Sequence, residues 1–90
     1  MKYYLYILKT VDNTLYCGIA CDVIARFNEH LSGKGAKYTA SRRPVACVYA
    51  ERHEDKIAAM QQEYAIKHLT RGEKEALIES ERNILEQLEL

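Results

Sequence analysis

The stretch "LYILKTVDNTLYCGIACDVIARFNEH", residues 5–30, decides the fold. Residues 3–9 are aromatic and apolar, as in a strand, and "VDNT" supplies turn residues before a return strand at residues 15–20. Asp22 is suited to cap a helix that begins at the next residue, and Gly33 is suited to end it. The stretch therefore predicts a β-hairpin followed by a helix.

The rest of the chain adds one strand and two helical segments. Pro44 precedes an apolar strand, "VACVYAER", at residues 45–52. A helix is expected over about residues 55–69, and a second helical segment over residues 70–90 begins with a Thr-x-x-Glu capping box. The order β-β-α-β-α-α predicts an α+β fold, a three-stranded antiparallel sheet flanked by helices.

Length and composition indicate one small domain. Ninety residues with 48% hydrophobic and 29% charged residues are ordinary for a globular chain. We expect no membrane segment and no signal peptide, because no apolar run is long enough and the first strand is followed by no small-residue cleavage site. Three cysteines without a C-x-x-C pair favour a reducing, cytoplasmic location.

The net charge of zero hides an asymmetry along the chain. Residues 1–52 hold eight Lys and Arg against four Asp and Glu, and residues 53–90 hold five against nine. The basic half includes the loop "SGKGAKYTASRRP", residues 32–44. Such a surface either binds a polyanion or is simply solvated, and charge alone leaves both interpretations open.

The register of the hairpin decides whether two tyrosines share a face of the sheet. A three-residue loop, Val11–Asn13, places Tyr6 opposite Gly18 and Tyr16 opposite Leu8, so both tyrosines point the same way. A two-residue turn would separate them. With glycine opposite, we expect the ring of Tyr6 to be open to an incoming group.

The first helix carries two polar residues beside its apolar stripe. At 100° per residue from Val23, Arg26 falls at about 300° and His30 at about 340°, which makes them stacked neighbours on the shoulder of the stripe. A guanidinium there suits phosphate oxygens, and an imidazole suits proton transfer or phosphate binding. The stripe itself is expected to consist of Val23, Ile24, Phe27 and Leu31.

Glu63, on the second expected helix, is the candidate metal ligand. Most of its helical neighbours are apolar, and one carboxylate can hold a hydrated Mg²⁺ that also contacts a substrate phosphate. An ordinary i, i+4 salt bridge with Lys67 is the competing interpretation. A zinc site of Cys17, Cys21 and His30 matches no common ligand spacing.

The ordered set of these residues resembles the GIY-YIG nuclease superfamily. Its two tripeptides correspond to "YLY" at residues 4–6 and "YCG" at residues 16–18, followed by Arg26, His30 and Glu63. The resemblance covers roughly residues 2–80 and is greatest to the small standalone bacterial branch. That branch is similar to the catalytic domain of structure-specific nucleases that cut branched DNA.

The resemblance implies a metal-dependent endonuclease domain over residues 1–80, with a C-terminal helical extension at residues 81–90. Arg26 would brace the scissile phosphate. Glu63 would hold one Mg²⁺ or Mn²⁺ ion, weakly without substrate. Tyr6 would be the general base, helped by Tyr16 or His30, and either Tyr6 or His30 fits that role. The residues expected to meet DNA are Gly18, Lys34, Lys37, Tyr38, Arg42 and Arg43.

Two other interpretations stay open at this stage. A non-catalytic nucleic-acid-binding module with the same fold would bind DNA through the basic loop, residues 34–43, without metal. An interaction domain would use the acidic C-terminal helix for a protein partner or for self-association. The substrate expected for an enzyme is branched or damaged DNA.

Overall fold

The computed structural model describes residues 2–34 and 43–88. It contains a three-stranded antiparallel sheet in the order β2-β1-β3, so the α+β prediction is confirmed. The strands are β1 (Tyr3–Thr10), β2 (Leu15–Ala20) and β3 (Pro44–His53). The helices are α1 (Val23–Leu31), α3 (Lys56–Lys67), α4 (Arg71–Ile78) and the 3-10 turn η1 (Leu85–Leu88). None of the helices in these described residues is long and apolar enough to cross a membrane.

The hairpin has the odd loop that the sequence predicts. The amide of Thr10 donates to the carbonyl of Thr14 at 3.0 Å, which closes the loop over the three residues between them. Tyr6 consequently pairs with Gly18, and Tyr16 lies across from Leu8. The predicted register is therefore confirmed, and both tyrosines belong to the face covered by α1.

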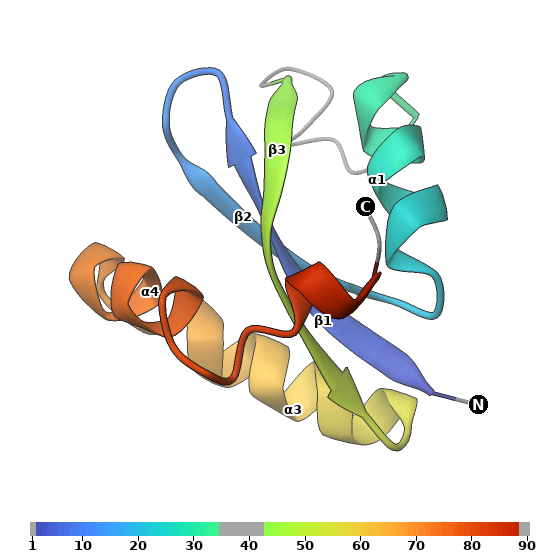
Figure 1. Ribbon diagram of the computed structural model, residues 1–90, viewed down its shortest axis with the longest axis vertical. Helices are drawn as coiled ribbons and strands as arrows, with labels where there is room; N and C mark the ends of the chain where they lie inside the picture. Colours follow the sequence, from blue (N-terminus) through green and yellow to red (C-terminus); the bar gives the residue numbers. More distant parts are fainter. Residues whose placement is uncertain (1, 35–42, 89–90) are drawn as a thin grey trace.

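Helices cover both faces of the sheet. Figure 1 shows α1 on one side and α3 with α4 on the other. Alternate residues of β1 point to the two sides, so each side has its own apolar cluster. The cluster on the α3 side is built on Leu5, Ile7, Cys17, Tyr49 and Ile66. The cluster on the α1 side is built on Tyr6, Leu8 and Val23, with Tyr16 and Phe27 packed against it.

Helix α1 begins and ends as expected but is rotated about its axis. The carboxylate of Asp22 accepts from the amide of Ala25 at 3.1 Å, and Gly33, at φ 82°, ends the helix. The expected apolar stripe is partly wrong, because Ile24 and Leu31 are 41% and 45% exposed. The face toward the sheet instead includes His30, which is 1% exposed. His30, a polar residue, thus lies in the core, where the sequence pattern predicted Leu31.

The predicted helix over residues 70–90 is wrong beyond its first two turns. Its capping box is present at Thr70 and Glu73, but α4 ends at Ile78. Asn83 explains the break. Its amide nitrogen donates to the carbonyls of Val48 and Ile78 at 2.9 and 2.8 Å, and its oxygen accepts from the amides of Ala50 and Leu85 at 3.3 and 3.0 Å. Two of these four bonds hold the chain against β3, and the other two join it to the end of α4 and the start of η1.

The segment after α4 passes around the edge of the sheet. The amide of Ile84 donates to the carbonyl of Ala50 at 2.9 Å, and Leu88 packs in the cluster on the α1 side. Leu77 and Ile78 pack against the cluster on the opposite side. The apolar residues Leu77, Ile78 and Leu88 of this segment thus contact the core of their own chain.

Candidate functional site

Tyr6 and His30 form a buried polar pair between the sheet and α1. The Tyr6 hydroxyl and the His30 Nε2 are 2.8 Å apart, and each residue is 1% exposed. The rings meet edge-on, with centroids 5.8 Å apart. A buried hydrogen bond of this kind holds both rings in one orientation, since breaking it would leave polar atoms without water.

Gly18 makes room for the Tyr6 hydroxyl. A Cβ atom at position 18 would lie 2.5 Å from the Tyr6 oxygen and 2.7 Å from its Cζ atom. The phenol therefore lies directly over the backbone of β2. The expectation that glycine leaves this ring open is wrong, because the ring itself fills the space.

Tyr16 extends this pair toward solvent. Its ring meets His30 edge-on at a centroid distance of 5.3 Å, and the residue is half-buried. Burial raises the pKa of Tyr16, while the positive charges of Lys67 and Arg26 oppose the rise. Tyr16 thus joins the buried pair to a surface that carries cations.

Arg26 places a guanidinium beside the two buried groups. Its side chain is 31% exposed and forms an ion pair with Glu29 at 3.3 Å. Burial raises the pKa of Tyr6 to about 12, although an interaction with Arg26 opposes the rise. Burial and the charge of Arg26 together lower the pKa of His30. At neutral pH the pair therefore consists of a neutral phenol and a neutral imidazole.

Glu63 reaches the same region from α3, on the other side of the sheet. Its carboxylate is 3.4 Å from the Lys67 ammonium, and its side chain is 23% exposed. The charge of Glu63 raises the pKa of both Tyr16 and Cys17, two neighbours on the edge strand β2. Because β2 is an edge strand, side chains from opposite faces of the sheet can meet around it.

The donor atoms at this edge fit a hydrated Mg²⁺ or Mn²⁺ ion and not a zinc ion. Glu63 is a partly exposed carboxylate that already attracts one cation, Lys67. One carboxylate suffices for Mg²⁺, which keeps most of its waters. The described part of the chain contains no cluster of three His, Cys, Asp or Glu residues able to hold a metal. Cys17 belongs to the cluster on the face away from His30, so the zinc interpretation finds no support.

The structure describes only part of the predicted DNA-binding loop. Its first and last residues, Lys34 and Arg43, are exposed. Lys37, Tyr38 and Arg42 lie outside the described residues. The carbonyl of Arg43 accepts from the amide of Val11 at 2.9 Å, which ties the start of β3 to the hairpin loop.

Lys67 is the residue that the sequence did not identify as part of the site. Its spacing from Glu63 signals only a common helical salt bridge. The structure adds that the positive charge of Lys67, like that of Arg26, acts on Tyr16 and opposes the rise of its pKa.

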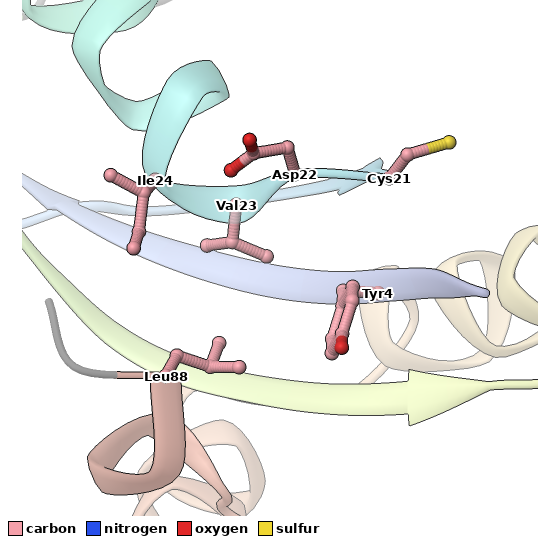
Figure 2. A pocket seen from close by; sticks show the side chains of 6 residues that line it. All are labelled: Tyr4, Cys21, Asp22, Val23, Ile24 and Leu88. Carbon is pink, nitrogen blue, oxygen red and sulfur yellow. The ribbon is translucent and has the colours of Figure 1, made fainter.

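A separate hollow of about 210 Å³ lies at the other end of α1. Figure 2 shows its walls beneath the start of the helix. It is lined by Tyr4, Cys21, Asp22, Val23, Ile24 and Leu88. No predicted site residue lines it, so the candidate site is the polar edge at β2.

Comparison with known proteins assigns the family. The sequence profile of the GIY-YIG catalytic domain matches residues 2–76. The chain belongs to the GIY-YIG family, a family of nuclease domains.

The similar proteins carry the name UPF0213. The UPF0213 protein SH2523 of Staphylococcus haemolyticus is 50% identical over 78 residues, which cover 87% of this chain and 95% of that protein. The UPF0213 protein YazA of Bacillus subtilis is 46% identical over 82 residues, covering 91% and 83%. The solution NMR structure of the UPF0213 protein BH0048 from Bacillus halodurans has a TM-score of 0.58 at 43% identity, covering 91% of this chain and 87% of that one.

Proposed function

We propose that the chain is a metal-dependent endonuclease that hydrolyses phosphodiester bonds in DNA. One observation carries the proposal. At the β2 edge of a GIY-YIG domain, Tyr16 lies near both the guanidinium of Arg26 and the Glu63–Lys67 pair, and it contacts the ring of His30. Cations that bind phosphate, a carboxylate for a metal ion and a proton acceptor are the parts that this hydrolysis needs.

The geometry supports a different role in the reaction for each polar group. Arg26 binds the scissile phosphate and stabilises the charge that develops on it. The Tyr6 hydroxyl is bonded to His30 and interacts with Arg26, so it lies between the proton acceptor and the phosphate-binding group. Tyr6 is 1% exposed in the DNA-free chain, so this mechanism requires DNA binding to admit a water molecule to its hydroxyl. That water then gives its proton to Tyr6 as Tyr6 passes its own to His30 Nε2. This relay avoids a free phenolate, which is unfavourable for a tyrosine whose pKa is about 12.

Glu63 is the residue that would hold one Mg²⁺ or Mn²⁺ ion. When bound, the ion supplies a Lewis acid beside the phosphate and the leaving oxygen. We expect weak binding without DNA, because a single carboxylate provides few protein ligands.

The substrate class and location follow from the surface and the thiols. We propose branched or damaged DNA as the substrate, bound through the basic loop at residues 34–43, whose first and last residues, Lys34 and Arg43, are exposed. The cytoplasm is the proposed location, since Cys17, Cys21 and Cys47 form no disulfide.

A cleavage assay tests the proposal. Branched and single-stranded DNA are incubated with Mg²⁺ and either the wild type or the Arg26→Ala/Glu63→Ala variant. We expect the double variant to lose at least about a hundredfold in rate, as is typical when groups that stabilise developing charge are removed. The matched control is Lys2→Ala/Glu54→Ala, which removes an ion pair of the same charges between exposed side chains.

Two results would count against the enzyme. Equal cleavage by the wild type and the double variant would show contaminating activity. Salt-sensitive DNA binding without cleavage, unchanged by Glu63→Ala and independent of metal, would support the non-catalytic binding module instead.

A further inference from the structure

We propose that Lys67 is a built-in counter-ion of Glu63, which a divalent metal ion must displace. The inference rests on the proposed function, because it concerns the same carboxylate. It adds a residue that controls how tightly the metal binds and that becomes available to the DNA phosphate when the metal arrives.

The ion pair engages one oxygen of a carboxylate that is only partly exposed. Glu63 is mostly covered, with 23% of its side chain exposed, whereas Lys67 is 53% exposed. The ammonium lies 3.4 Å from the carboxylate oxygen. A metal ion that approaches from solvent meets a carboxylate that is already neutralised, and it is repelled by the lysine charge at short range.

Lys67 keeps a favourable environment after it leaves Glu63. It is the last residue of α3, where the negative end of the helix dipole attracts positive charge. Its long, flexible side chain can therefore leave Glu63 without losing all favourable interactions. An ion pair at 3.4 Å whose lysine is half exposed is also weak, so the exchange is within reach of a divalent ion.

The freed ammonium would lie beside the other groups of the site. Its charge acts more strongly on Tyr16 than that of Arg26, and it also acts on Cys17. Tyr16 is thus influenced by one cation from α1 and one from α3. A phosphate bound near Tyr16 would interact with both Arg26 and the released Lys67, so that metal binding and DNA binding favour each other.

Metal affinity measured without DNA tests the inference independently of cleavage. Mn²⁺ binding is followed by electron paramagnetic resonance for the wild type, Lys67→Met and Lys67→Arg. We expect Lys67→Met to bind Mn²⁺ about threefold to tenfold more tightly, since the competing charge is gone, and Lys67→Arg to bind like the wild type. Lys56→Met is the matched control on the same helix and should leave the affinity within about twofold of the wild type.

The outcomes separate this inference from the proposed function. If Glu63→Gln abolishes Mn²⁺ binding but Lys67→Met binds no tighter than the wild type, the inference is overturned and the metal site stands. If neither the wild type nor Lys67→Met binds Mn²⁺ through Glu63, both fail. Tighter binding by Lys67→Met supports the inference even where cleavage is not detected.

Discussion

Replacing Gly18 by alanine tests whether the buried tyrosine is as tightly enclosed as the structure indicates. The new Cβ atom would lie 2.5 Å from the Tyr6 oxygen and 2.7 Å from its Cζ atom, whereas ordinary contacts begin at 3.4 Å. The ring must therefore move by about 0.9 Å at its hydroxyl end. The ring cannot rotate away from the added methyl group, because Tyr6 is 1% exposed and its hydroxyl is hydrogen-bonded to His30.

The expected cost has two parts. Overpacking a core by one methyl group costs about 1–3 kcal/mol, and disturbing a buried hydrogen bond costs about 1 kcal/mol more. We expect Gly18→Ala to lower the free energy of unfolding by about 2–4 kcal/mol. For a domain of this size that corresponds to a drop in Tm of roughly 10–30 °C.

Urea unfolding followed by circular dichroism measures the loss. The control is Gly72→Ala in the first turn of α4, where an added Cβ meets no atom within 4 Å, and we expect it to be neutral or slightly stabilising. In a Tyr6→Phe background the nearest clashing atom is absent, so Gly18→Ala should cost about 1 kcal/mol less. A Gly18→Ala protein within about 0.5 kcal/mol of the wild type would refute the tight packing of Tyr6 on β2.

Two further predictions concern the C-terminal segment and alkaline pH. Asn83→Ala removes four hydrogen bonds to backbone groups, and we expect it to lower the free energy of unfolding by about 2–4 kcal/mol, again measured in urea. Asn83→Asp keeps the acceptor but turns a carboxylate oxygen toward the carbonyls of Val48 and Ile78, so it should cost at least as much, and a clearly smaller loss for Asp than for Ala would contradict this account. Burial raises the pKa of Tyr6 to about 12, so the folded chain holds a proton that the unfolded chain loses above pH 10. Its contribution to stability is therefore complete below pH 10 and falls as the pH approaches 12. Tyr6→Phe should show a shallower decline than the wild type between these values, and equal slopes would contradict the shift.

The hairpin register could be predicted because it depends on local chemistry. Asp12 and Asn13 favour a turn, and Asn13 adopts a φ of 66°. The alternation of side chains along each strand then determines which residues share a face of the sheet. The position of Tyr6 opposite Gly18 follows from that loop alone. The grouping of the candidate site on β1, β2 and the first helix was accessible for the same reason.

The rotation of α1 could not be predicted from its own residues. Periodicity favours Leu31 over His30 as a core residue, since it ranks side chains by hydrophobicity. The structure buries His30 because the hydroxyl of Tyr6, from a strand 24 positions earlier in the sequence, satisfies its nitrogen. The hydrophobic periodicity of a helix cannot reveal a hydrogen-bond partner that is so distant in the sequence.

The same limit applies to the end of the chain. Residues 70–90 have the charges and leucines of a helix, and Asn83 is only mildly unfavourable within one. Its four bonds involve backbone groups of β3, α4 and η1, which become neighbours only after folding. The role of Lys67 was hidden in a similar way, because its approach to Tyr16 depends on how α3 crosses the edge of the sheet.

The segment around Asn83 also forms hydrogen bonds with one edge of the sheet, strand β3. Exposed strand edges invite pairing with other chains and aggregation. On β3, the Asn83 side chain and the Ile84 amide take up the outward carbonyls of Val48 and Ala50, as a short fourth strand would. On β2 the described chain adds no further strand. Within residues 2–34 and 43–88, the chain thus blocks strand addition at the β3 edge, and its polar residues gather at the other edge, β2.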